Sequence, residues 1–115
     1  MTASGRLGPD ERLRRRADFQ KVYEHGARIR GRFGTFFIWP NKLEVGRLGI
    51  AASKKLGGAV QRNRAKRLIR EVFRRNKLAP GFDIVVVPRR ELLEAGLTDL
   101  ERDYRTVVAR HSRHV

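Results

Sequence analysis

The chain contains no cysteine. This absence excludes a disulfide framework, a metal site built on thiolates and a cysteine nucleophile. Long hydrophobic runs are also missing: the longest strongly apolar stretches, 36–39 and 84–87, have four residues each, whereas a membrane-spanning helix needs about 20. Residues 1–6 contain no apolar segment of the kind found in secretory signals. We therefore expect a cytoplasmic protein.

Acidic residues are scarce. Of the 115 residues, 12 are Asp or Glu and 27 are Lys or Arg, which gives a net charge of +15. This excess indicates a polyanionic partner, either a nucleic acid or an anionic membrane surface. Hydrophobic residues make up 40% of the chain, and a chain of this size can bury roughly two-thirds of its unfolded surface. We therefore expect one folded domain rather than a basic disordered tail.

The positive charge is concentrated in particular segments. Residues 62–77 contain eight basic residues against Glu71 alone, and residues 1–32 contain nine against four acids. Residues 91–103 reverse the balance, with five acids against Arg102. We expect the basic segments to face the polyanion and the acidic segment to remain in solvent.

Hydrophobic periodicity predicts three helices and a small sheet. Segments 15–25 and 59–76 carry apolar residues at helical spacing, and Thr98 with Glu101 has the pattern of a capping box that opens a third helix. The predicted strands cover 28–31, 35–39, 47–53 and 82–87. The predicted fold class is α+β, a small mixed sheet of about four strands with helices packed on it as a two-layer sandwich, in the order α-β-β-β-α-β-α.

The helix at 59–76 carries the sharpest functional signal. At about 100° per residue, Lys66, Arg67, Arg70 and Arg74 cluster opposite its apolar stripe. A row of cations without alternating acids repels itself unless a polyanion compensates it, so we favour a nucleic acid over an ordinary solvated face. Guanidinium groups can also bind phosphates in bidentate fashion and stack on bases.

A pair of lysines at 54–55 is a weaker signal. These residues follow a predicted strand and precede the basic helix, where a phosphate can bind beside the helix N-terminus. Lysines also flank strands simply for solubility, and both interpretations stay open here.

Aromatic residues give a third signal. Phe19 and Tyr23 lie one helical turn apart, and strand alternation sends Phe37 and Trp39 to one face and Phe36 to the other. Rings near a basic strip can stack on unpaired bases. A Phe at helical spacing is more often part of a core, so spacing alone does not choose between the two roles.

Side chains typical of catalysis are missing. His25 lies at a helix end, the other two histidines lie near the C-terminus, and no HExxH, GxSxG or GxxxxGK[ST] motif occurs. We predict no catalytic side chain and no metal ligand. Residues 13–111 are predicted to form a single RNA-binding domain, after a disordered lead-in at 1–12 and before a frayed tail at 112–115.

The segment 48–70, LGIAASKKLGGAVQRNRAKRLIR, resembles the protein subunit of bacterial ribonuclease P. The Arg62-Asn63-Arg64 core matches the RNR motif of that family. Residues 18–26 resemble its first helix and 82–87 its late strand, so the resemblance covers about residues 13–110. It implies the ribosomal protein S5 domain 2-like fold.

The resemblance also implies a function in RNA processing. The RNA subunit would use Mg²⁺ to remove the 5′ leader of precursor tRNA endonucleolytically, and the protein, which would bind no cofactor alone, would bind the RNA subunit and the leader. The residues implied to bind the catalytic RNA are Arg62, Asn63, Arg64, Lys66, Arg67, Arg70 and Arg74. Those implied to bind the leader are Phe19, Tyr23, Trp39, Ser53, Lys54 and Lys55. Neither a membrane nor DNA is then an expected partner.

Three other classes remain as alternatives. A ribosomal or other structural RNA-binding protein could use the same basic helix. A DNA-binding module is less favoured, because no helix-turn-helix partner is evident around 59–76. A protein-only nuclease is the least favoured, because the acids lie away from the basic helix.

Overall fold

The computed structural model describes residues 11–76 and 81–113. The order of helices and strands is the predicted α-β-β-β-α-β-α. The elements are α1 (Arg16–His25), β1 (Ala27–Arg30), β2 (Gly34–Pro40), β3 (Arg47–Ile50), α2 (Ala59–Arg75), β4 (Phe82–Pro88) and α3 (Leu97–Arg113), with short 3-10 helices η2 (Lys54–Leu56) and η3 (Arg90–Glu94).

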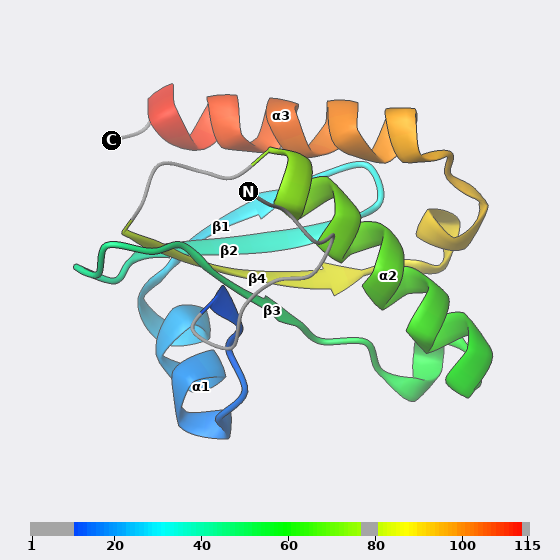
Figure 1. Ribbon diagram of the computed structural model, residues 1–115, viewed down its shortest axis with the longest axis horizontal. Coiled ribbons are helices and arrows are strands. Elements are labelled where there is room, and N and C mark those ends of the chain that lie inside the picture. The colour runs from blue at the N-terminus through cyan, green and yellow to red at the C-terminus, as the bar shows by residue number, and fades with distance from the viewer. Residues whose placement is uncertain (1–10, 77–80, 114–115) are drawn as a thin grey trace, which may run out of the picture.

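The four strands form one mixed sheet in the order β1-β2-β4-β3. β2 pairs antiparallel with β1 and β4, whereas β3 and β4 are parallel. A parallel pair needs a crossover connection, and α2 supplies it. Figure 1 shows α2 and α3 on one side of the sheet and α1 on the other. The main sandwich thus consists of the sheet and the α2–α3 layer, and α1 packs on the opposite face.

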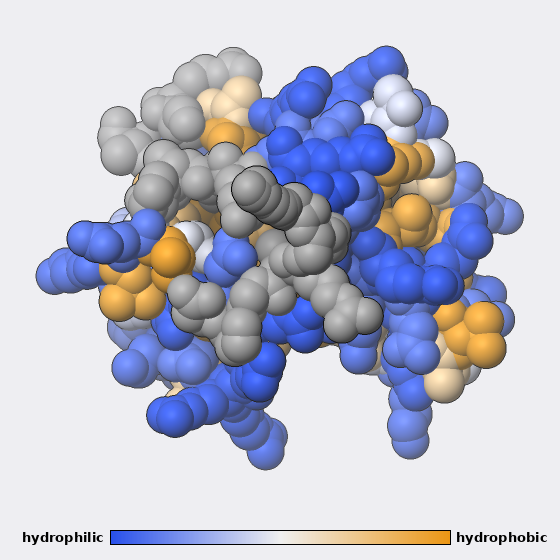
Figure 2. Space-filling view, viewed as in Figure 1, coloured by the Kyte–Doolittle hydropathy of each residue, from blue (hydrophilic) through white to orange (hydrophobic). Residues whose placement is uncertain are grey.

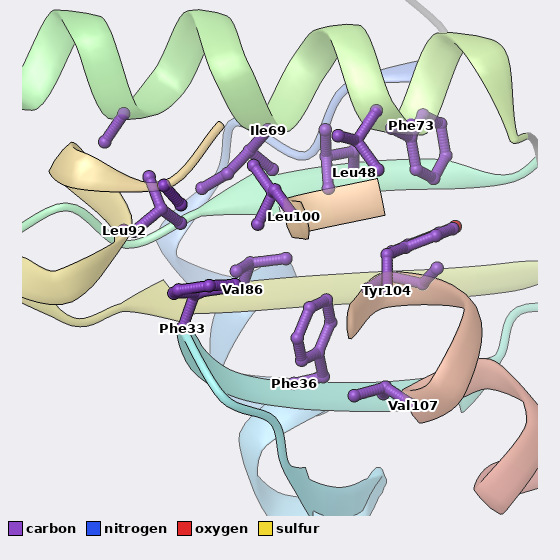
Figure 3. Close-up of a cluster of buried hydrophobic side chains, with 14 of the residues drawn as sticks. Phe33, Phe36, Leu48, Ile69, Phe73, Val86, Leu92, Leu100, Tyr104 and Val107 are labelled. Carbon is purple, nitrogen blue, oxygen red and sulfur yellow. The ribbon is translucent and has the colours of Figure 1, made fainter. Parts of the chain in front are cut away.

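The main core lies between the sheet and the α2–α3 layer (Figure 3). In β2 the burial alternates, with Phe36 and Ile38 buried and Phe37 and Trp39 half-buried, as predicted from the period of two. The opposite side of the core is supplied by α2 and α3, whose buried side chains include Ile69, Phe73, Leu100, Tyr104 and Val107. The core therefore fixes α2 with its cations directed away from the sheet.

Two boundary predictions are wrong. The strand predicted at 47–53 ends at Ile50, because Ser53 Oγ accepts a hydrogen bond from the Lys55 backbone N–H and caps η2. The capping box does not open α3, which begins at Leu97. Glu101 instead accepts a hydrogen bond from Asn76 Nδ2 at 2.5 Å and joins the end of α2 to α3.

The acidic segment is left in solvent only in part: Glu91, Glu94 and Asp99 are exposed as expected, whereas Glu101 and Asp103 are half-buried. The Asp103 carboxylate accepts hydrogen bonds from the backbone N–H groups of Arg32 (2.9 Å) and Phe33 (3.2 Å), so it holds the turn between β1 and β2. Gly31 lies under this carboxylate, where an added Cβ would come within 2.7 Å of Asp103 Oδ2. Asp103 therefore stabilises the fold rather than remaining free in solvent.

A buried ion pair joins the ends of three strands on the α1 side. Asp83 in β4 is only 1% exposed, and its carboxylate accepts hydrogen bonds from Arg47 Nε (2.8 Å), Arg47 Nη2 (2.7 Å) and Asn41 Nδ2 (2.7 Å). The hydrogen bond to Asp83 raises the pKa of Arg47. Arg47 lies in β3 and Asn41 directly follows β2, so one carboxylate ties together the neighbouring strands.

The predicted lead-in and tail fall largely outside the described residues. Within the described part, Arg12 pairs with Leu48 of β3, and α3 continues to Arg113. Among the helices of residues 11–76 and 81–113, none has the length and apolar character needed to span a bilayer.

Candidate nucleic-acid interface

Most cations of α2 lie on the outer half of the helix. Ala65, Ile69, Val72 and Phe73 are buried on its inner side. At about 100° per residue, Asn63, Arg67, Arg70 and Arg74 point away from these residues. Arg62 and Lys66 fall toward the buried side of the helix and are half-buried. On the face of the molecule that Figure 2 shows, most of the coloured side chains are hydrophilic. The helix thus presents a broad cationic surface.

The two arginines of the RNR motif are held by backbone carbonyls. Arg62 Nη1 donates to the Gly57 oxygen at 3.3 Å, and Arg64 Nε donates to the Leu93 oxygen at 3.1 Å. A guanidinium has five N–H donors, so the remaining donors of each side chain can still bind a phosphate. These contacts orient the two arginines before any partner binds.

Arg74 is partly neutralised within its own helix. Its Nη2 lies 2.5 Å from Glu71 Oε2, and Arg75 Nε lies 2.8 Å from the same oxygen. Hydrogen bonds from these two arginines lower the pKa of Glu71, so the carboxylate stays charged. Of the cations predicted to bind RNA, Arg74 is therefore the one whose charge is most compensated by an acid within the protein.

Sequence reasoning missed Arg12 as part of this surface. The Leu13 N–H donates to the Leu48 oxygen at 2.9 Å, which fixes the preceding residue beside β3. Arg12 lies near Arg70: burial and then the charge of Arg12 lower the pKa of the Arg70 guanidinium. Arg12 Nε is buried without a hydrogen-bond partner in the described structure. The two arginines are far apart in sequence, so no local pattern predicts their meeting.

The predicted aromatic residues come together on the opposite face of the sheet. Phe19 lies over Gly49, where an added Cβ would be 2.7 Å from Phe19 Cζ. The ring of Tyr23 meets Phe37 edge to face, with centroids 4.9 Å apart, and Trp39 lies 5.7 Å from the ring of His25. Tyr23 is 37% exposed, whereas Phe19, Phe37 and Trp39 are half-buried. Tyr23 is therefore the ring most accessible to a base.

Ser53, Lys54 and Lys55 lie between the end of β3 and the start of α2. All three are exposed, and the Ser53 hydroxyl caps η2. The turn that follows requires glycine at position 57, whose φ of 140° is disfavoured for other residues. This segment connects the aromatic face of the sheet with the cationic face of α2.

The described residues contain no group of three or more His, Cys, Asp or Glu side chains placed to hold a metal ion. The chemistry that the described surface offers is the binding of phosphates by cations and the stacking of bases on rings.

Comparison with known proteins identifies similar chains. Residues 7–112 match the family model described as Ribonuclease P. The Ribonuclease P protein component of Clostridioides difficile (strain 630) is 39% identical over 101 residues, which cover 85% of this chain and 89% of the relative. That of Thermotoga maritima is 44% identical over 86 residues, covering 73% and 74%.

Solved structures share the fold. An RNase P protein structure from Staphylococcus aureus matches with a TM-score of 0.76 at 34% identity, covering 86% of this chain and 93% of that one. The RNase P protein from Thermotoga maritima matches with a TM-score of 0.77 at 36% identity, covering 87% and 96%.

Proposed function

Because the chain belongs to the ribonuclease P protein family, we propose that it binds the RNA subunit of ribonuclease P and the 5′ leader of precursor tRNA on two separate surfaces. Its role is that of an RNA-binding subunit in tRNA 5′ processing. The observation that carries the division into two surfaces is the position of Asn63, Arg64 and Arg67 on the exposed side of α2, across the sheet from the aromatic residues of α1.

The cationic surface of α2 is assigned to the RNA subunit. Neutralising several phosphates releases condensed counterions, which supplies affinity that does not depend on sequence. The side chains proposed to make these contacts are Arg62, Asn63, Arg64, Lys66, Arg67, Arg70 and Arg74. We include Arg12 in the proposal because its charge acts on Arg70.

The aromatic surface between α1 and the sheet is assigned to the leader. Stacking of a base on an aromatic ring does not require a particular base, which suits a segment whose sequence differs from one precursor to another. Phe19, Tyr23 and Trp39 supply rings there, and Ser53, Lys54 and Lys55 supply polar and cationic groups at the adjoining edge.

The protein's contribution to the reaction is binding and positioning. Mg²⁺ would be held by the RNA subunit and would supply the hydrolytic chemistry. The net charge of +15 lowers the repulsion between two polyanions, the RNA subunit and the substrate. No protein side chain is assigned a catalytic role.

The direct test is cleavage of a leader-bearing precursor tRNA by transcribed ribonuclease P RNA at low Mg²⁺ concentration. Adding the protein is expected to increase the rate of cleavage at the mature 5′ end. A basic peptide of equal net charge is the control for nonspecific reduction of the repulsion between the two RNAs. If folded protein gave no more acceleration than the peptide, the chain would be better described as a structural RNA-binding protein without a role in cleavage.

Replacing Tyr23 with alanine is expected to weaken binding of leader-bearing precursor tRNA by about 1–2 kcal/mol, within the range of single base–aromatic stacks. The value lies in the lower part of that range because one edge of the ring already packs on Phe37. The measurement is the Kd of the reconstituted ribonucleoprotein for this substrate and for mature tRNA. Leu43→Ala removes another exposed apolar side chain and should change neither value, and equal losses of Tyr23→Ala for both RNAs would argue against stacking on the leader.

A further inference from the structure

Helix α1 covers only part of the sheet face on which it lies. Residues paired across strands share a face, so the pairings Phe37↔Val85 and Gly49↔Val85 define one row across the sheet. Phe19 lies over Gly49 and Tyr23 packs on Phe37 at the two ends of this row. The next row on this face, toward the C-terminal ends of β3 and β4, is only partly covered: Ala51 and Val87 pack against the same apolar cluster as Phe19 but remain half-buried.

This neighbouring row runs from one edge of the sheet to the other. The pairings Arg30↔Thr35 and Thr35↔Val87 place three of its members, and the hydrogen bond from the Ala51 N–H to the Val86 oxygen at 2.9 Å carries the parallel register on to Ala51. Thr35, Val87 and Ala51 are half-buried, and Arg30 is exposed. The row is therefore a partly open strip with a cation at its outer end.

A second cation stands beside the first. Arg28 pairs with Phe37, so its side chain leaves the sheet on the same face as Arg30. Both side chains are exposed, and in the described part of the chain neither forms an ion pair with an acid. They are two residues apart on one strand, about 6.8 Å along it, which is close to the spacing of successive phosphates in an extended single strand.

The edge strand that carries these arginines is held in place. Arg110 Nη1 donates to the Arg30 oxygen at 2.9 Å and links β1 to α3. The turn after β1 is fixed by Asp103, and by Arg89, whose Nη2 donates to the oxygens of Gly31 and Arg32. Arg28 and Arg30 thus project from a strand with a defined position, as a specific binding surface requires.

We propose that Arg28 and Arg30 form the outer end of the leader-binding surface, where they bind phosphates of leader nucleotides that have crossed the sheet from β3 to β1. This inference rests on the proposed function. α2, assigned to the RNA subunit, follows β3 through Ser53, Lys54 and Lys55, so nucleotides near the cleavage site belong at that edge. Three strand spacings of about 4.8 Å separate β3 from β1, so only a leader of several nucleotides reaches the two arginines.

The test compares leader lengths in the reconstituted ribonucleoprotein. With a leader of about ten nucleotides, Arg28→Ala with Arg30→Ala should lower substrate affinity about 10-fold. The slope of log K against log salt concentration should fall in magnitude by about 1.4, the value for two phosphate contacts on a single strand. With a leader of about two nucleotides, which ends over the sheet, the same variant should bind like the wild type.

Two further variants make the result specific. Arg102→Ala with Arg105→Ala removes the same charge from exposed positions of α3 and should not change the preference for the longer leader. Arg28→Lys with Arg30→Lys should recover most of the affinity, because the charge remains. Equal losses for both leaders, or no loss for either, would overturn the role of β1 while leaving the proposed function intact. If the wild-type protein bound both leaders equally, leader binding itself would fail, and this inference with it.

Discussion

Replacing Asp83 with alanine is expected to lower the free energy of unfolding by about 3 kcal/mol, the lower end of the range for removing one partner of a buried ion pair. The carboxylate is 1% exposed and accepts three hydrogen bonds, so its removal leaves donors of Arg47 and Asn41 without their acceptor. The lower end applies because the Arg47 side chain is 25% exposed and can recover some hydration. For a domain with a typical stability of about 5–15 kcal/mol, this is a large fraction of the total.

Denaturant unfolding of the isolated protein measures this loss. Asp99→Ala removes a carboxylate that is 53% exposed and should change stability by less than about 0.5 kcal/mol. Replacing both partners, Arg47→Met with Asp83→Leu, should recover much of the lost stability, because no unpaired charge then remains buried. If Asp83→Ala were as stable as Asp99→Ala, the three hydrogen bonds would not be contributing to the fold as the geometry indicates.

The parts of the fold that depend on local periodicity are predictable from the sequence. The apolar spacing in α2 predicts its buried side, and Ala65, Ile69, Val72 and Phe73 are buried there. Alternation in β2 predicts that Phe37 and Trp39 share a face away from Phe36, and the burial pattern agrees. Both predictions succeed because a helix and a strand each impose a fixed angle between successive side chains.

Features that depend on which strands become neighbours are not predictable in this way. Asp83 and Arg47 meet only because β3 and β4 pair in parallel, and nothing in the two local sequences specifies that pairing. The same holds for Arg12 and Arg70. The sequence predicts a strand at 28–31 that contains Arg28 and Arg30, but not its neighbour in the sheet. Their place on the face of Phe37 follows from the β1–β2 register.

The capping-box prediction shows how a tertiary contact displaces a local one. Thr98 and Glu101 have the required spacing, but Asn76 at the end of α2 donates to the Glu101 carboxylate and Arg105 donates to the Asn76 side-chain oxygen. α3 accordingly begins at Leu97. A pattern of four residues cannot reveal that another helix end will compete for the same carboxylate.

Replacing Lys66, Arg67 and Arg70 together with alanine is expected to lower affinity for ribonuclease P RNA about 100-fold, if each phosphate contact contributes about 1 kcal/mol. The slope of log K against log salt concentration should fall by about 2–3, since each lost phosphate contact contributes about 0.7–0.9. These three side chains are chosen because Arg62 and Arg64 also hold backbone carbonyls, whereas Arg74 is paired with Glu71. The effect is therefore attributable to RNA contacts rather than to local structure.

The stability of the triple variant separates a binding surface from a structural one. Alanine is the best helix former, and the loss of Arg70 removes both a partly buried charge and its repulsion by Arg12, so unfolding should require equal or higher denaturant concentration. Arg90→Ala with Arg102→Ala and Arg105→Ala, at exposed positions of η3 and α3, removes the same charge and should leave most of the affinity. If both triple variants lost affinity equally, the net charge of +15 rather than the face of α2 would account for binding. If only the α2 variant loses affinity for the RNA, and its stability is not reduced, these three cations serve RNA binding rather than folding.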